Sequence, residues 1–194
     1  MLKQLYIQYI NKFKKGILFS KTYKNIKKTA KYKGNNSKFN YDIFKKFNPR
    51  LKGYLIMDKN TEFYMGHKAI VSYGAKVTLH RNAKISIGDN TYINFNFICE
   101  SGYSITIGKN CAISWNVTII DSDFHKLNNT KENNNVFIGD HTFIGCNSTI
   151  LKGVHIGKNV IIGANSLVTK SIPDNCMACG NPAKIIKRDI AWDD

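Results

Sequence analysis

An aliphatic residue recurs at every sixth position from 138 to 168, and this period constrains the fold more than any other feature of the chain. The residues are Ile138, Ile144, Ile150, Ile156, Ile162 and Val168, and glycine follows at 139, 145, 157 and 163. A period of six matches neither an amphipathic helix nor a single half-buried strand. It is typical of a solenoid, in which each repeat supplies a short strand and a turn, and neighbouring repeats bury each other's apolar face. We therefore expect coils of three hexapeptides, about 18 residues each, that form a triangular prism.

The repeats define the expected organisation of the chain. They are weak from residue 64, become clear near Ile87, and stop at the polar segment 121–135 before resuming at Ile138. We predict an N-terminal extension over 1–63, a β-solenoid over 64–173 with an extruded loop at 121–135, and a C-terminal segment over 174–194. A loop that leaves a rigid scaffold is where function is expected.

Most of the positive charge lies in the N-terminal extension. The chain has 194 residues and a formal net charge of +16, and residues 1–52 carry 15 Lys or Arg against a single acid, Asp42. Residues 2–18 predict a basic helix with one apolar, aromatic-rich face. Two interpretations stay open: an anchor on an anionic membrane surface, with Lys3, Lys12, Lys14 and Lys15 toward the lipid, or a helix packed on the solenoid. No nucleic-acid recognition module accompanies the charge, so nucleic acid is not an expected partner.

The cysteines and the absence of targeting features indicate a cytoplasmic protein. There are five cysteines, an odd number without the spacing of a secreted disulfide scaffold. The N-terminus has neither the apolar length of a membrane span nor the order of a signal peptide. We expect reduced thiols and a cytoplasmic location, either free or peripheral at the inner face of the plasma membrane.

The turns between Ile138 and Pro173 and the ending Gly180-Asn-Pro-Ala-Lys184 resemble the hexapeptide-repeat acyltransferases. Within this family the resemblance is to the maltose and galactoside O-acetyltransferases and the polysaccharide-modifying acetyltransferases. The resemblance implies a mainly β fold, a left-handed parallel β-helix. It also implies a homotrimer with active sites between subunits, acetyl-CoA as cosubstrate and a saccharide as acceptor.

His125, in the run Asp121-Ser-Asp123-Phe-His125 at the root of the loop, is the candidate general base. Acetyl transfer to a hydroxyl needs a group of near-neutral pKa to remove the hydroxyl proton, and imidazole suits this task. The catalytic histidine of the family occupies the same place. Asp121, Asp123 or a backbone carbonyl could orient the ring. No regular set of histidines on neighbouring coils surrounds His125, so no metal is expected.

The resemblance also assigns substrate-binding residues. Asn94 and Tyr92 match the family stretch that faces the acceptor, although asparagine is equally the favoured residue of these turns. The acetyl-CoA-binding candidates are Phe143 over the pantetheine arm, Cys146 and Ala164 at one edge of the prism, Thr169 after the last full coil, and Lys170, Lys184 and Lys187 toward the adenosine phosphates.

These observations predict an acetyl-CoA-dependent O-acetyltransferase that acts on a saccharide, such as a precursor of a surface polysaccharide. The alternatives within the enzyme class are N-acetylation of a nucleotide-linked amino sugar and acetylation of serine or an antibiotic. Outside that class the alternative is a non-catalytic scaffold, which would need neither His125 nor the basic tail.

Overall fold

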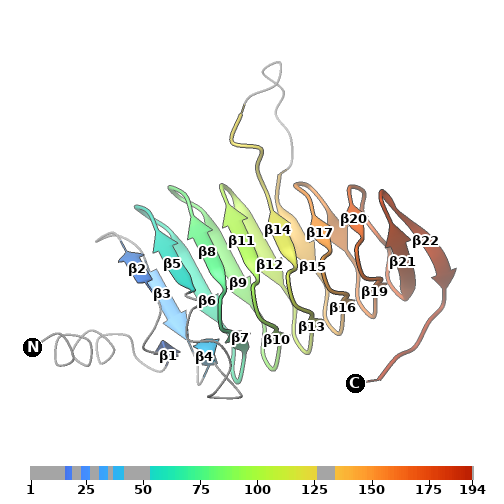
Figure 1. Cartoon of the computed structure of the whole chain (residues 1–194), viewed down its shortest axis with the longest axis horizontal. Helices are drawn as coiled ribbons and strands as arrows, with labels where there is room; N and C mark the ends of the chain where they lie inside the picture. The colour runs from blue at the N-terminus through green and yellow to red at the C-terminus, as the bar shows by residue number, and fades with distance from the viewer. Residues whose placement is uncertain are drawn as a thin grey trace, which may run out of the picture.

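The chain folds as a parallel β-solenoid whose coils stack along one axis (Figure 1). The structure, a computed structural model, describes residues 16–18, 23–26, 31–34, 37–41, 53–125 and 134–193. Each coil passes through three sheets in turn, which we call A, B and C, and each strand pairs in parallel with the corresponding strand of the next coil. The predicted β-solenoid is confirmed.

The regular elements of the described residues are all strands. Sheet A contains β1 (Gly16–Leu18), β4 (Ser37–Tyr41), β7 (Ile70–Ser72), β10 (Tyr92–Ile93), β13 (Ala112–Ile113), β16 (Phe143–Ile144), β19 (Ile161–Ile162), β21 (Cys176–Gly180) and β22 (Ala183–Arg188). Sheet B contains β2 (Tyr23–Ile26), β5 (Tyr54–Met57), β8 (Lys76–Leu79), β11 (Ile98–Ser101), β14 (Thr118–Ile120), β17 (Thr149–Ile150) and β20 (Leu167–Val168). Sheet C contains β3 (Lys31–Gly34), β6 (Glu62–Met65), β9 (Lys84–Ile87), β12 (Ser104–Ile107), β15 (Val136–Ile138) and β18 (His155–Ile156).

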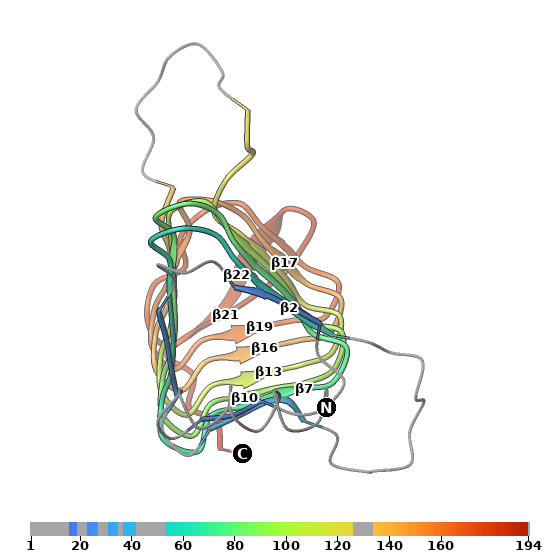
Figure 2. The same ribbon diagram turned by 90° about the vertical axis from the view of Figure 1, so that its left-hand side faces the viewer.

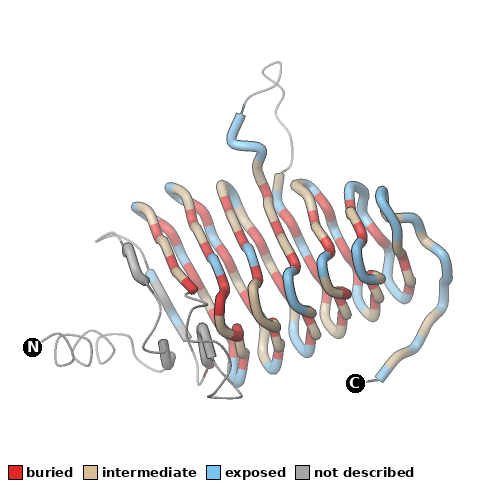
Figure 3. The backbone as a smooth tube through the Cα atoms, in the orientation of Figure 1, coloured by how far each residue is buried: buried red, intermediate tan, exposed pale blue. Residues whose placement is uncertain are grey.

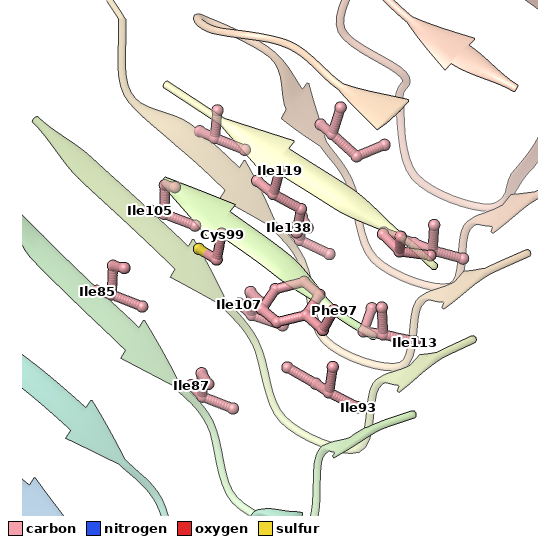
Figure 4. Packing of buried hydrophobic residues seen from close by; sticks show 14 of the residues in the cluster. Ile85, Ile87, Ile93, Phe97, Cys99, Ile105, Ile107, Ile113, Ile119 and Ile138 are labelled. Atoms are coloured by element: carbon pink, nitrogen blue, oxygen red, sulfur yellow. The ribbon is translucent and has the colours of Figure 1, made fainter. Parts of the chain in front are cut away.

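The hydrophobic core is a set of side-chain stacks inside the prism. In sheet B, register pairs Leu55, Val77, Cys99, Ile119, Ile150 and Val168 in succession along the axis. All six are buried to 1% exposure or less, while their neighbours along each strand are less buried (Figure 3). Figure 4 shows the same interior filled mostly by isoleucine. Successive strand residues point to opposite faces, so most inward positions are apolar and the outward positions are free to carry function.

The solenoid begins earlier than the hexapeptide period indicates. β5 and β6 already pair in register with β8 and β9, so the expected boundary between residues 63 and 64 falls inside strand β6. Asn60 and Asn82, whose side chains bond across adjacent early turns, are 22 residues apart. His141 and Asn159, which bond in the same way across later turns, are 18 residues apart. The longer early coils hide a six-residue period from the sequence.

The predicted N-terminal helix is wrong at its C-terminal end. Residues 16–18 were expected to be helical but form strand β1, which pairs in parallel with β4. The ladder to a neighbouring strand satisfies the backbone groups that a helix would satisfy internally. Residues 2–15 of the expected helix, including the four lysines, lie outside the described residues. No helix among the described residues is long and apolar enough to cross a membrane.

The three corners of the prism are named by the sheets that meet there. Corner AB includes residues 145–148 and 163–166, corner BC includes residues 121–125 and 151–154, and corner CA includes residues 139–142 and 157–160. Asparagines at these turns adopt positive φ, for example 58° at Asn147 and 56° at Asn165. At corner CA a Cβ on Gly139 would lie 2.6 Å from the Gly157 carbonyl carbon, so a side chain there would collide with the next coil.

The cysteines are free thiols that pack with the coils. Burial raises the pKa of the Cys99 thiol well above its ordinary value and raises that of Cys111 to about 11. Both therefore stay protonated near neutral pH and serve as small apolar residues.

Candidate functional site

The chain leaves the solenoid at corner BC through a buried carboxylate. Ile119 points into the prism and Ile120 outward, so the alternation directs the next residue, Asp121, inward, where it is fully buried. Its carboxylate accepts hydrogen bonds from Ser101 Oγ and Gly102 N, both at 2.6 Å, and from Tyr103 N at 3.1 Å. Asp121 thus ties the root of the loop to the turn of the preceding coil.

Burial raises the pKa of the Asp121 carboxyl, because the charged form loses its hydration. The hydrogen bonds from Ser101, Gly102 and Tyr103 favour the ionised form and oppose this rise. Both carboxylate oxygens accept hydrogen bonds from the turn, and among the described residues no hydrogen bond joins Asp121 to His125. The local contacts give Asp121 a structural role at the loop root.

The other acid of the run, Asp123, is paired with a lysine of a later coil. Its Oδ2 lies 2.8 Å from Lys152 Nζ, and the two side chains are 44% and 29% exposed. His125 is exposed at the point where the loop departs. Within the described part of the chain, no hydrogen bond or ion pair joins either acid to the imidazole, so the choice of an orienting partner for His125 stays a prediction.

Three side chains beside the loop root were missed by the sequence analysis. His80 Nε2 lies 2.8 Å from Glu100 Oε1, and the His80 ring lies 4.4 Å from the Phe124 ring. The spacing of 20 residues between His80 and Glu100 is close to one coil, but the length of the early coils could not be read from the sequence.

Corner AB carries the small residues expected to receive acetyl-CoA. Cys146 and Ala164 follow strands β16 and β19, and Asn165 N donates to Cys146 O at 2.9 Å, so the two turns stack on successive coils. Cys146 is half-buried and Ala164 is exposed. Asn94 lies at the same corner, where its Oδ1 accepts from Phe95 N at 2.8 Å. Tyr92 lies on sheet A beside it, and its hydroxyl accepts from Ser72 Oγ at 3.1 Å.

The C-terminal segment extends this corner with positive charge. β21 continues sheet A beyond β19, and a Cβ on Gly163 would lie 2.7 Å from Cys179 Cβ. β22 returns antiparallel to β21 and places Lys184 opposite Cys179 and Lys187 opposite Met177, both exposed. Lys184 therefore lies only two strands beyond β19, the strand that leads to Ala164.

An aromatic side chain from the tail covers part of sheet A at its other end, beside corner CA. Trp192 stacks on His141, with ring centroids 4.2 Å apart and an interplanar angle of 3°. The same indole lies edge-on to Phe143, with ring centroids 6.1 Å apart. Phe143, the residue predicted to cover the pantetheine arm, therefore contacts the chain's own C-terminal tail on its outward side.

The candidate residues fall into two groups on different edges of the prism. His125, Asp121, Asp123, Thr169 and Lys170 lie at corner BC, because Thr169 and Lys170 follow β20 of sheet B. Asn94, Tyr92, Phe143, Cys146 and Ala164 lie at corner AB or on the adjoining sheet A, and Lys184 and Lys187 lie on the strand that ends sheet A. Sheet B separates the two corners (Figure 2). Among the described residues, no group of three or more His, Cys, Asp or Glu side chains is arranged to hold a metal ion.

Comparison with known proteins finds a matching transferase family and relatives that are named acetyltransferases. Residues 135–170 match the family model described as bacterial transferase hexapeptide (six repeats). The chain is 43% identical over 119 residues to polysialic acid O-acetyltransferase of Escherichia coli O1:K1 / APEC, covering 58% of this chain and 39% of that protein. It is 38% identical over 143 residues to a putative acetyltransferase of Dictyostelium discoideum, covering 68% of this chain and 75% of that protein.

A solved structure has the same fold. Galactoside acetyltransferase in complex with coenzyme A is 32% identical, with a TM-score of 0.55, over 68% of this chain and 66% of that chain. The similarity thus spans less than two thirds of the length of this enzyme and of polysialic acid O-acetyltransferase.

The structural role of Asp121 can be tested by unfolding. Asp121→Ala leaves the N–H groups of Gly102 and Tyr103 without their acceptor, so we expect the free energy of unfolding to fall by about 1–3 kcal/mol. Asp121→Asn keeps a carbonyl oxygen as acceptor and should lose less. Urea unfolding followed by circular dichroism measures both. Asp123→Ala is the control, because it removes only a half-exposed ion pair and should cost at most about 1 kcal/mol; equal losses in Asp121→Ala and Asp123→Ala would contradict this role.

Proposed function

The chain belongs to the hexapeptide-repeat acyltransferase family, and on that premise we propose that it is an acetyl-CoA-dependent O-acetyltransferase that acts on a hydroxyl of a saccharide. The observation that carries the proposal is His125, an exposed imidazole at the point where a polar loop interrupts the repeats. The names of the relatives, polysialic acid O-acetyltransferase and galactoside acetyltransferase, support both the acetyl group and the saccharide.

In this proposal acetyl-CoA binds along corner AB, where small residues and nearby positive charge suit it. Cys146 and Ala164 are small, so an extended pantetheine arm can approach the backbone of two stacked turns. Lys184 and Lys187 are exposed on β22, on the last strand of the same sheet, and their ammonium groups suit the adenosine phosphates. In this proposal Phe143 borders the arm, and Thr169 and Lys170 contact the donor from corner BC of a second chain.

His125 acts as general base in the proposed reaction. The acceptor hydroxyl oxygen attacks the thioester carbonyl carbon while His125 takes the hydroxyl proton. A new C–O ester bond forms, the C–S bond breaks, and the proton returns to the sulfur of the leaving thiolate to give free CoA. Asn94 and Tyr92 bind the acceptor, and Asp123 or a backbone carbonyl orients the imidazole, because Asp121 is engaged by the turn at Ser101 and Gly102.

The separation of the two corners supports an active site shared between chains. Within one chain, sheet B lies between His125 and the Cys146–Ala164 edge. A homotrimer that sets corner BC of one subunit against corner AB of the next brings the two groups together, and closed cyclic symmetry then repeats the site three times. The left-handed coiling and the threefold assembly implied by the resemblance are part of this proposal.

The role of His125 is tested by CoA release. Purified protein is given acetyl-CoA with a panel of saccharides, lipid-linked glycans, serine and nucleotide-linked amino sugars, and free thiol is measured. We expect release with a saccharide, and His125→Ala should lower kcat by about 10²–10⁴-fold with little change in acetyl-CoA affinity. Full activity in His125→Ala would exclude the proposed base. If CoA is released only with an amine or with serine, the proposed saccharide acceptor is wrong and that compound class takes its place.

We also propose that residues 2–15 contact an anionic membrane, which would place the enzyme at the cytoplasmic face where polysaccharide precursors are made. The basis is the pattern of apolar residues and lysines in this segment, which lies outside the described residues.

The membrane proposal predicts that the full-length protein sediments with vesicles containing anionic lipid and is partly released by high salt. Substitution of Leu5, Ile10 and Phe13 by serine should abolish sedimentation, because the apolar contribution is lost while the charge remains. Full-length protein that stays in the supernatant at low salt would overturn the proposal, as would unchanged sedimentation of the triple variant.

A further inference from the structure

A cluster of three side chains beside the loop root takes no part in the proposed chemistry. It consists of His80, Glu100 and Phe124, which come from three successive coils at the BC end of sheet B. His80 Nε2 lies 2.8 Å from Glu100 Oε1. The His80 and Phe124 rings lie 4.4 Å apart with a tilt of 48°. The cluster therefore links the rigid sheet to the residue that immediately precedes His125.

The backbone of Phe124 has an unusual conformation. Its φ is 57°, in the left-handed region that glycine and asparagine adopt readily and that bulky side chains rarely adopt. Most other described non-glycine residues with positive φ are asparagines in the regular turns. A phenylalanine in this conformation must be held by its surroundings, and such positions concentrate at functional sites.

Ser122 and Gly102 make two further contacts with Phe124. Its N–H donates to Ser122 Oγ at 3.0 Å. Gly102 leaves room for the ring, since a Cβ at that position would lie 3.3 Å from Phe124 Cε1 and 3.1 Å from Ser122 Cβ. The ring thus lies between the turn at Gly102 and the imidazole of His80.

His80 itself is held by the sheet. The backbone N–H of His80 donates to Ser101 O at 2.9 Å. Glu100 lies in β11, where it pairs with Thr78 of β8 and Ile120 of β14. The hydrogen bond to Glu100 fixes the imidazole plane, so the ring contact with Phe124 is made by a side chain with little freedom. The other ionisable groups nearby are Asp121, engaged by the turn, and Asp123, paired with Lys152.

We propose that Glu100 and His80 are positioning residues, which hold Phe124 in its left-handed conformation and thereby set the direction in which the His125 side chain leaves the coil. The inference rests on the proposed role of His125 as general base. Because φ of Phe124 determines where the next residue points, a relaxed Phe124 would displace the imidazole. Displacement of a reacting group by about 1 Å costs on the order of 10²-fold in rate.

Substitutions at Phe124 separate the backbone conformation from the ring. Asparagine tolerates positive φ and alanine does not. We expect Phe124→Asn to keep kcat within about 3-fold of the parent and Phe124→Ala to lower it by about 10–100-fold. Acetyl-CoA and the acceptor that supports CoA release are used throughout. Equal kcat values for Phe124→Asn and Phe124→Ala would overturn the proposal, because the backbone conformation would then not matter.

Substitutions at His80 test the support of that conformation. His80→Ala removes the ring and should lower kcat by about 10–100-fold while both KM values change less than about 3-fold. His80→Phe restores a ring against Phe124 and should recover most of the loss. A raised acceptor KM with unchanged kcat would show instead that the pair binds the acceptor, and this overturns positioning.

The matched control is His155→Ala. His155 is an exposed imidazole that likewise lies against a phenylalanine, with its ring 4.5 Å from that of Phe137 and a tilt of 42°, but it lies on sheet C. The His155→Ala variant should leave kcat unchanged. A loss of kcat equal to that of His80→Ala would show that the effect of His80→Ala is not specific.

The outcome separates this inference from the proposed function. If His125→Ala is inactive and His80→Ala is fully active, only the positioning role fails. If His125→Ala is active, the proposed base itself fails. If His80→Ala does not fold, as judged by its unfolding temperature, the comparison of Phe124→Asn with Phe124→Ala decides.

Discussion

The structure depends on the register between successive coils. Each strand donates and accepts backbone hydrogen bonds with the same strand of the next coil, so an inward residue always lies on another inward residue. Stacks such as Ile119, Ile150 and Val168 then fill the prism with aliphatic side chains. A one-residue slip would turn these side chains outward and expose the polar set to the interior, so register and core composition enforce each other.

The candidate catalytic residues lie where this regular stacking of coils is interrupted. At corner BC, Asp121 places a buried carboxylate where the strands elsewhere bury mostly aliphatic side chains, and this carboxylate is satisfied by Ser101, Gly102 and Tyr103. This polar anchor ties the start of the loop to the turn of the preceding coil. His125 follows four residues later and is exposed where the loop departs.

Much of the fold could be predicted from the sequence, because the late coils have a strict period. The stacking of Cys146 on Ala164 follows directly from a coil built of three hexapeptides. The early coils could not be predicted from the sequence, because they are longer than 18 residues and because Met57, Phe63 and Met65 occupy core positions. Both features obscure the repeat. The short strand at 16–18 was mistaken for helix because so short a segment carries no decisive periodicity.

The site was predicted less completely than the fold. His125 was identifiable as a break in the pattern, but the contacts of its neighbours depend on which residues face each other across coils. Asp121 and Asp123 had been equal candidates for orienting the imidazole, and the structure adds that Asp121 bonds to the turn while Asp123 pairs with Lys152. The choice between them stays a prediction. The His80–Glu100 pair needed the coil length, which the sequence did not reveal.

The central claim is that the active site combines corner BC of one chain with corner AB of another. Co-expression of two inactive chains tests it most directly: His125→Ala, which lacks the base, and Ala164→Trp, which blocks the donor edge. Random mixing should pair an intact His125 with an intact edge at about one quarter of the interfaces and restore about that fraction of the parent activity. Activity no higher than that of the two variants expressed separately, in assemblies shown to contain both chains, would contradict the shared site.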